Sequence, residues 1–229
     1  IHAGTQKFRQ ALGLVAPSKT DPNAIELPPY YPDLPEVRQD IARHYDNIRT
    51  MDAKVGAILA ALEKDGLAES TIIIWTTDHG DGLPRAKREL LDTGIHVPMI
   101  IYVPEQLAKG TLAALRPQVQ GYSEDNNAAL TSQLISFVDL APTILQLAGI
   151  SPPDYLHGRD FLQGLDSTKT SRERGLRQYI YASRDRIDEV MDKQRAIRSH
   201  DYKYIRSDFP KVPGGHALAY RDNLDMTRA

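Results

Sequence analysis

Apolar residues recur at helical spacing across residues 37–62, where roughly every third or fourth position is hydrophobic. This spacing predicts one long amphipathic helix. Asp33 followed three residues later by Glu36 predicts its start, and Lys64 followed by Gly66 predicts its end. We therefore expect the helix to begin just after residue 33 and to stop near residue 64.

Two apolar runs follow this helix, at residues 72–75 and 97–103. Runs of β-branched and aromatic residues without polar alternation are typical of strands buried on both faces of a largely parallel sheet. A helix, a short loop and a buried strand in that order make half of a βαβ unit. The pattern therefore predicts an α/β fold with a mostly parallel central sheet.

The last part of the chain predicts a smaller unit. A short helix is expected to start at Asp139, to carry Pro142 in its first turn and to end at Gly149. Prolines, glycines and polar residues then mark a lobe boundary, which divides a large domain at residues 1–165 from a small α+β lobe at residues 166–229. Short runs rich in tyrosine and isoleucine predict an antiparallel sheet in this lobe, at residues 179–182, 195–198 and 202–206.

Composition narrows the classes of function. The chain has 229 residues, of which 41% are hydrophobic and 25% charged, with a net charge of −2, so a general affinity for nucleic acid or anionic membranes is not expected. The absence of cysteine excludes disulfides and thiolate zinc sites within the chain. Its apolar runs fall short of the roughly 20 residues that span a bilayer. The chain begins at Ile1 without methionine, and we expect it to be a segment of a longer protein.

The candidate chemistry lies between the two apolar runs. Asp78, His79, Gly80 and Asp81 follow the first run directly, at the strand end where ligands bind in open α/β sheets. Aspartate and histidine can donate to one cation, although an arbitrary pair of this kind is more often a strand-end cap beside a surface histidine. The basic residues that follow, of which Lys87 is one, suit a tetrahedral oxyanion. The combination favours sulfate or phosphate chemistry.

A series of motifs in this order resembles the sulfatase family. They cover most of the chain: D-x-x-V-G-x-I-L-x-x-L at residues 52–62, T-I-I-I-x-T-x-D-H-G-D at 71–81, K-x-x-L-x-x-x-G-I-x-V-P at 87–98, V-D-L-A-P-T-I-L-x-L-A-G at 138–149 and H-G-R-D-F at 157–161. Two further runs, R-D-R-I-D-E at 184–189 and Y-K-Y-I-R at 202–206, resemble bacterial members akin to heparan N-sulfatases.

The resemblance implies an alkaline-phosphatase-like sandwich and assigns roles to several residues. Asp78 and His79 match two ligands of the divalent ion, usually Ca²⁺, with Mn²⁺ or Mg²⁺ as alternatives. Lys87 matches the lysine that contacts the sulfate group, against the alternative of a solvated lysine. Arg88 matches no family role and is expected to be solvated. His96 is expected to have a packing role.

Three further candidates also come from the resemblance. His2 is a candidate for the histidine near the leaving group, with an ordinary loop histidine as the alternative. Arg184 and Arg186, in the small lobe, are candidates for binding an anionic sugar. Ion pairing of these arginines within the lobe is the alternative, with Asp185, Asp188 or Glu189. The remaining histidines are expected to be structural or on the surface, at positions 44, 157, 200 and 216.

The nucleophile of the family does not occur in this sequence. Sulfatases convert Cys or Ser in a C/S-x-P/A-x-R motif to formylglycine; this chain has no cysteine, and none of its serines begins that motif. The resemblance therefore implies that residues 1–165 are the C-terminal part of a catalytic domain. Its partners would be the N-terminal half of the protein, which carries the formylglycine and two more aspartate ligands, and a sulfated small molecule or glycan.

The activity expected from the resemblance is hydrolysis of a sulfuric ester or sulfamate, with glycans as the substrate class. Two alternatives stay open. One is a phosphate ester or phosphonate hydrolase of the same superfamily, and the other is a degenerate domain that binds sulfated glycans without cleaving them. Related bacterial enzymes are often periplasmic, so the resemblance favours a periplasmic or secreted location.

Overall fold

The computed structural model describes residues 19–107, 133–162, 176–211, 222 and 224–228. Its regular elements within these ranges are, in chain order, η1 (Pro22–Ala24), α2 (Pro35–Lys64), η2 (Ala68–Ser70), β1 (Ile73–Thr76), α3 (Asp92–Ile95), β2 (Met99–Tyr102), η3 (Glu105–Leu107), η5 (Phe137–Asp139), α4 (Leu140–Leu147), β3 (Ile180–Ile187), β4 (Val190–Arg198), β5 (Lys203–Ser207) and α5 (Asp225–Arg228).

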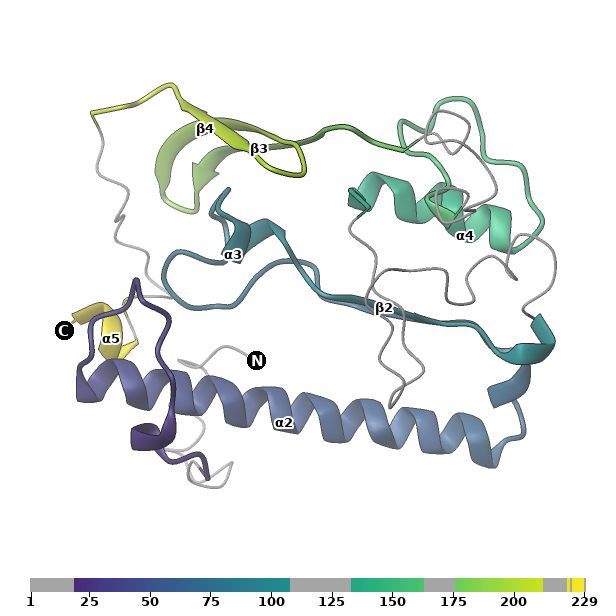
Figure 1. Cartoon of the computed structure of the whole chain (residues 1–229), viewed down its shortest axis with the longest axis horizontal. Coiled ribbons are helices and arrows are strands. Elements are labelled where there is room, and N and C mark those ends of the chain that lie inside the picture. The colour runs from purple at the N-terminus through teal and green to yellow at the C-terminus, as the bar shows by residue number, and fades with distance from the viewer. Residues whose placement is uncertain (1–18, 108–132, 163–175, 212–221, 223, 229) are drawn as a thin grey trace.

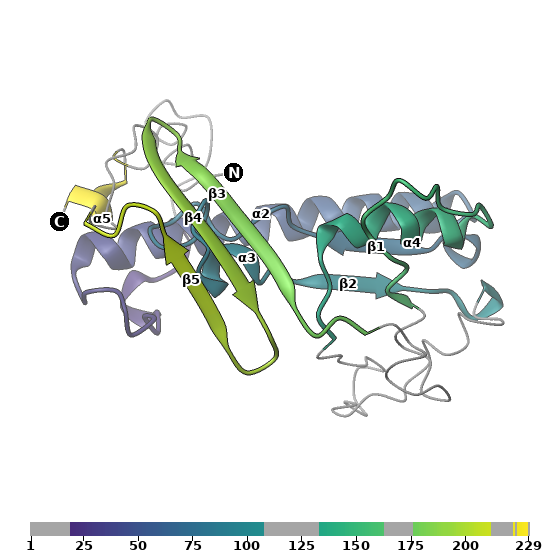
Figure 2. The same ribbon diagram turned by 90° about the horizontal axis from the view of Figure 1, so that it is seen from above.

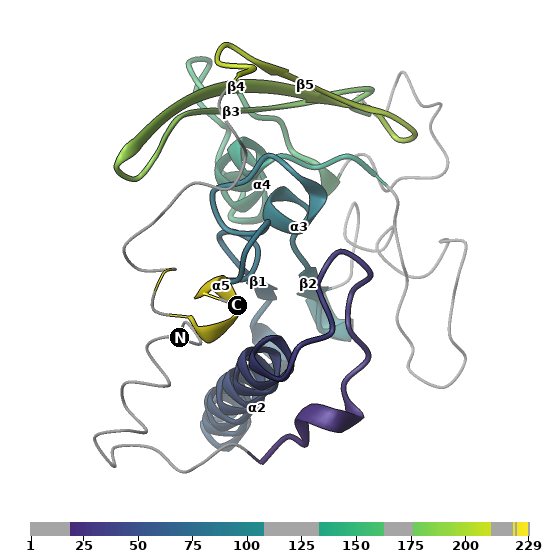
Figure 3. The same cartoon turned by 90° about the vertical axis from the view of Figure 1, so that its left-hand side faces the viewer.

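These elements form layers (Figures 1 and 3). Helix α2 lies along one side, and a sheet of β3, β4 and β5 lies on the opposite side. Between them run β1 and β2, with α3 under the sheet and α4 beside it (Figure 2). The loop that carries the candidate site therefore lies in the middle of the molecule.

Helix α2 confirms the predicted long helix, although its start differs by one residue. Leu34 is the N-cap residue, because the Asp33 carboxylate accepts hydrogen bonds from the Arg38 guanidinium instead of from the backbone. Gly66 follows the helix end with a φ of +70°, as a glycine at that position should. None of the helices in the described ranges is long and apolar enough to cross a bilayer.

The packed core surrounds the first turns of α2. Val37 and Ile41 are buried there against Leu83 from the loop after β1 and Leu224, which directly precedes α5. Farther along, the apolar face of α2 is exposed at several of the positions that the sequence predicts to be buried: Ile48, Met51, Ile58 and Leu59. The helix is therefore covered at one end and largely uncovered at the other.

The mostly parallel central sheet is not confirmed. β1 pairs with β2 in antiparallel fashion, Ile73 opposite Tyr102 and Thr76 opposite Met99, and the described residues hold two antiparallel sheets. All four residues of β1 are half-buried, not buried on both faces. An unbroken apolar run specifies a strand, but it does not specify the direction of the neighbour that pairs with it.

The antiparallel sheet predicted near the C-terminus is confirmed. β3 pairs with β4 and β4 with β5, with a bulge between Arg184 and Arg186. We call β3, β4 and β5 the C-terminal sheet. Successive side chains alternate between its faces: Tyr181 and Tyr204 lie exposed on the outer face, whereas Arg184 lies on the face toward the loop after β1.

Helix α4 also confirms its prediction, with an unexpected role for its first residue. Asp139 occupies the N-cap position and Gly149, with a φ of +72°, follows the helix end. The buried Asp139 carboxylate accepts hydrogen bonds from the backbone N–H groups of Ser136 (3.0 Å) and Arg159 (2.9 Å) and pairs with Arg177. It therefore joins the helix start to two later segments of the chain.

Candidate active site

The turn after β1 places a carboxylate and an imidazole side by side. Asp78 is 86% exposed and His79 is 33% exposed, with Asp78 Oδ2 3.5 Å from His79 Nε2. His79 Nδ1 lies 2.7 Å from the Gly80 carbonyl oxygen, which can only accept, so Nδ1 carries the proton. In the neutral ring Nε2 then keeps its lone pair, as a metal-binding histidine requires.

Two glycines close the loop around this turn. We call residues 77–95 the site loop. The Gly80 N–H donates to the Gly94 carbonyl at 3.0 Å. A Cβ on Gly80 would lie 1.7 Å from the Thr93 carbonyl oxygen, and one on Gly94 would lie 2.2 Å from that of Glu89. The glycines of the D-H-G and G-I-x-V-P motifs are therefore required because backbone passes where a side chain would stand.

The same fold of the loop brings Lys87 back to the turn. The Lys87 N–H donates to the Asp81 carbonyl at 2.8 Å. On either side of Lys87, the backbone of Arg85 and Arg88 has φ values of +66° and +71°. Residues other than glycine rarely adopt this left-handed region. Each such residue costs roughly 1–3 kcal/mol, and strain of this kind persists where surrounding contacts hold it. The half-buried Lys87 is therefore held between two strained residues, one hydrogen bond from the Asp78–His79 turn.

His44 is a contact of this site that the sequence analysis missed. Its Nε2 lies 3.0 Å from Asp81 Oδ1, although α2 and the site loop are far apart in sequence. The hydrogen bond from His44 lowers the pKa of Asp81, partial burial opposes the shift, and the electrostatic interaction with His44 adds to it. Helical spacing alone could have placed His44 on the buried side of α2, next to Ile41, but it could not have named Asp81.

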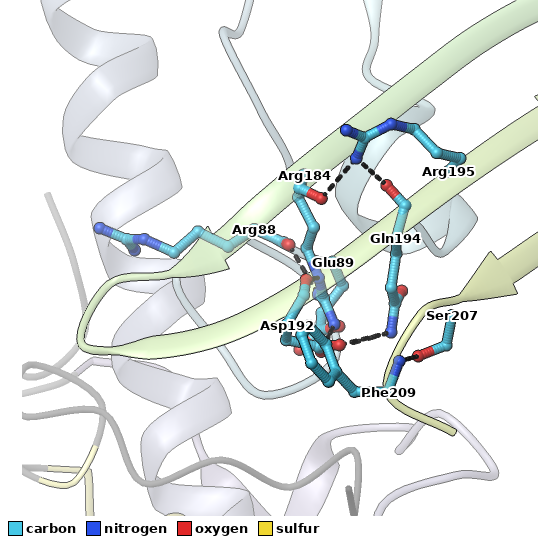
Figure 4. Close-up of polar contacts among 8 residues, drawn as sticks. All are labelled: Arg88, Glu89, Arg184, Asp192, Gln194, Arg195, Ser207 and Phe209. Carbon is cyan, nitrogen blue, oxygen red and sulfur yellow. Dashed lines mark hydrogen bonds and ion pairs between the residues drawn. The ribbon is translucent and has the colours of Figure 1, made fainter. Parts of the chain in front are cut away.

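The two arginines of the C-terminal sheet are placed differently. Arg184 reaches the site loop, where its Nη1 donates to Glu89 Oε2 at 2.6 Å, and it also pairs with Asp192 (Figure 4). Arg186 is exposed and donates to the carbonyls of its own turn, those of Asp188 (3.3 Å) and Glu189 (2.9 Å). The structure thus brings Arg184 to the loop that carries Lys87, but not Arg186.

Three other residues were given expected roles from the sequence: His2, Arg88 and His96. His2 lies outside the described residues. Arg88 is not a freely solvated side chain, because its Nε pairs with Asp188 Oδ1 at 2.8 Å. His96 is exposed and so has no packing role in a core.

The donor set fits part of a cation site. Asp78 and His79 offer one hard and one borderline donor on the same turn, whereas Ca²⁺ takes six to eight ligands. Among the described residues there is no group of three or more histidine, aspartate or glutamate side chains that could hold a metal ion. These two side chains therefore fit a site that other residues must complete.

Comparison with known proteins identifies the family. The sulfatase family model matches residues 8–150, more than half of the chain. The chain belongs to the sulfatase family. An ulvan-active sulfatase of Formosa agariphila is 38% identical over 198 residues, which cover 86% of this chain and 29% of that protein. Human N-sulphoglucosamine sulphohydrolase is 28% identical over 160 residues, which cover 66% of this chain and 28% of that enzyme.

Solved structures support a sulfatase fold of the alkaline-phosphatase-like type. A Bacteroides fragilis protein described as a sulfatase aligns with a TM-score of 0.59 and 21% identity, covering 86% of this chain and 42% of that one. A protein solved with its substrate D-glucosamine-2-N,6-O-disulfate aligns with a TM-score of 0.56 and 22% identity, covering 76% and 33%. This sulfatase chain thus spans less than half the length of the relatives that it matches.

Proposed function

We propose that the whole protein is a metal-dependent hydrolase of sulfuric esters or sulfamates. The observation that carries the proposal is the site loop itself. Its two motif glycines close it, and the 2.8 Å hydrogen bond from the Lys87 N–H to the Asp81 carbonyl supports a sulfate-binding role for Lys87 near the Asp78–His79 turn. The family match supports the reaction class.

Within this proposal Asp78 and His79 bind the divalent ion, with Ca²⁺ as the expected metal. The hydrogen bond from His79 Nδ1–H to the Gly80 carbonyl supports this role. It orients the ring and leaves the Nε2 lone pair available to bind the ion. When bound, the ion would neutralise charge on the oxygens of the sulfuryl group. The other ligands, two aspartates in the family, would come from the part of the sulfatase domain that lies outside this chain.

Lys87 would bind a sulfuryl oxygen through its ammonium group. Its backbone is held by the hydrogen bond to Asp81, which supports this role because the side chain then starts from a fixed point. We propose that His2 donates a proton to the leaving oxygen or nitrogen, as the family resemblance implies. The nucleophile is expected to be a formylglycine supplied by the same outside part.

We propose a sulfated glycan as the substrate and a periplasmic or secreted location. Two relatives support the substrate class by name, the ulvan-active sulfatase and the sulphoglucosamine sulphohydrolase. Arg184 and Arg186 were predicted to bind an anionic sugar. Arg184 is paired with Glu89 and Asp192, which favours a structural role over sugar binding. Arg186 is exposed, and we propose that it contacts the sugar.

A second candidate is hydrolysis of phosphate esters or phosphonates. A phosphonate monoester hydrolase of Silicibacter pomeroyi shares the fold, with a TM-score of 0.51 and 18% identity. A fold at that identity does not select a substrate. Binding of sulfated glycans without turnover is a third outcome, and a single set of assays separates all three.

The test uses the full-length protein with an aryl sulfate, an aryl phosphate and an aryl phosphonate. We expect turnover of the sulfate, and a drop in kcat/KM of about 100- to 1,000-fold in Lys87→Ala, because a charge aimed at the transition state is lost. Lys211→Ala, at an exposed position after β5, is the matched control and should keep wild-type kcat/KM. Preference for the phosphorus esters, or an unchanged Lys87→Ala variant, would contradict the proposal.

A further inference from the structure

Cationic side chains of the C-terminal sheet bind one short segment of the site loop. The segment comprises residues 88–92 and directly follows Lys87. Arg184 of β3 donates through Nη1 to Glu89 Oε2 at 2.6 Å and to the Arg88 carbonyl at 2.9 Å (Figure 4). It therefore binds both a side chain and the backbone of the segment.

The other two strands add parallel contacts. Lys203 of β5 donates through Nζ to the Leu90 carbonyl at 2.9 Å and pairs with Asp92. Arg198 of β4, directly opposite Lys203 in the sheet, donates to Asp92 Oδ2 at 3.0 Å. Each strand of the C-terminal sheet thus contributes one cation to the same five residues of the loop.

The Arg184 contact is the most deeply buried of the three. The side chains of Arg184, Glu89 and Asp192 are 7%, 11% and 4% exposed. Charges removed from water to this degree must be paired, and the fork of a guanidinium can serve two carboxylates at once. One of these carboxylates belongs to the sheet and the other to the loop, so Arg184 joins the two.

The loop needs support of this kind because its own backbone is strained. Arg85 and Arg88 hold positive φ values on either side of Lys87, and such conformations relax unless neighbours fix them. The Arg88 carbonyl is one of the atoms that Arg184 binds. The contact therefore acts on one of the two strained residues that set the position of Lys87.

We propose that Arg184 is a positioning residue that acts through Lys87. Arg184 holds residues 88–92 against the C-terminal sheet. It thereby keeps the Lys87 ammonium near the Asp78–His79 turn, where it can bind the sulfuryl group. The effect on catalysis rests on the proposed function of Lys87; the effect on the loop does not. Sheet and site loop accordingly form one functional unit, with the sheet outside the reacting centre.

The test compares Arg184→Met and Glu89→Met with Arg206→Met in the full-length protein. Glu89→Met removes the ion pair between Arg184 and the loop but leaves the Arg184–Asp192 pair and the hydrogen bond to the Arg88 carbonyl, so it tests the loop contact even if Arg184→Met fails to fold. Arg206 is the matched control, because it lies exposed on the same sheet and pairs with Asp208, outside the site loop. Hydrogen exchange of backbone amides is measured by mass spectrometry.

We expect amides of residues 87–95 to exchange at least about 10-fold faster in the first two variants, and at the wild-type rate in Arg206→Met. Arg184→Lys should not restore protection, since an ammonium lacks the fork that reaches both carboxylates. Unchanged exchange at residues 87–95 in Glu89→Met and Arg184→Met would overturn the proposal.

Kinetics then ask whether Arg184 acts through Lys87. We expect kcat/KM for an aryl sulfate to fall about 100-fold in Arg184→Met, since a displacement near 1 Å can cost that much. In the double variant Arg184→Met, Lys87→Ala, kcat/KM should fall no further than in Lys87→Ala alone. If Arg184 had a merely structural role, its substitution would lower kcat/KM further. Additive losses would overturn the coupling. If the wild-type protein cleaves none of the test esters, the proposed function fails while the exchange result still decides the role of Arg184 in the loop.

Discussion

At the scale of single residues, the site depends on places where a side chain is absent. Gly80 and Gly94 leave room for carbonyl oxygens of the opposite limb of the site loop, and this close approach returns Lys87 to the turn. Glycine is needed at these positions for a steric reason, not for flexibility.

Gly94→Ala should therefore damage the site. The new Cβ would stand 2.2 Å from the Glu89 carbonyl oxygen and 2.4 Å from that of Ala86, both of which are backbone atoms that cannot move alone. We expect the free energy of unfolding to fall by about 1–3 kcal/mol, as in overpacked cores, and kcat/KM to fall with it. Denaturant unfolding and the aryl sulfate assay are the measurements.

Gly56→Ala is the control for this prediction. Gly56 lies within α2, where a Cβ added to it would meet nothing within 4 Å, so alanine should stabilise the helix by up to about 1 kcal/mol. Equal effects of the two substitutions would refute the steric account of Gly94.

Prediction from sequence succeeds at this scale where a residue's role is local. Gly66 and Gly149 end helices as expected, because the positive φ that they supply is a property of the helix end itself. The pairing of His44 with Asp81 was missed, since it depends on how α2 crosses the loop. The ion pairs of Arg184 were missed for the same reason: the expected partners were sequence neighbours, whereas Glu89 lies 95 positions away.

At the scale of elements, the start of α4 is fixed by a buried charge. Partial desolvation raises the pKa of Asp139, but the hydrogen bond from Arg177, two backbone N–H groups and the charge of Arg177 outweigh it, so the pKa lies below 3.8. A carboxyl whose pKa is lowered in the folded state stabilises that state at pH values above its unfolded pKa. The contribution is lost as the pH falls through the folded value.

Asp139→Asn should consequently lower stability most at neutral pH. Because Arg177 would lose its buried partner, we expect a loss of about 3–5 kcal/mol in unfolding free energy. The difference in Tm between variant and wild type should shrink as the pH falls below 3.8. Thermal unfolding across the acid range is the measurement. The exposed pair of Asp185 provides a contrast: Asp185→Asn should cost less than about 1 kcal/mol at any pH.

Elements were predicted from sequence better than their partners were. The period of α2 and the alternation in β3, β4 and β5 are repeated over many residues, so they identify the elements directly. The direction of pairing between β1 and β2 carries no such local signal, and the parallel arrangement inferred from their apolar runs was not confirmed.

At the scale of the whole molecule, a stripe of apolar side chains on α2 faces solvent. Ile58 is 68% exposed, and Met51 and Leu59 on the same helix are exposed as well. Single exposed apolar residues are ordinary, but a row of them at helical spacing indicates a covered surface. The matched relatives are far longer than this chain, so we propose that their additional part packs here in the full-length protein.

Ile58→Asp should therefore destabilise the full-length protein by about 2–3 kcal/mol, since it places a charge in a buried apolar contact. Ala60 lies two residues farther on, about half a turn around the helix, and Ala60→Asp should cost about 0.7 kcal/mol or less. Denaturant unfolding measures both, and equal costs would show that this face of α2 is not covered.

The contacts between residues 88–92 and the C-terminal sheet join positions that lie 95 to 113 residues apart in the chain. A growing polypeptide exposes the Asp78–His79 turn long before the strands that steady it have left the ribosome. Activity should hence arise late in biosynthesis, after the codon for Lys203 has been translated. A nonsense mutation before that codon would yield a product with every loop motif in place but without the Lys203 contact to the loop.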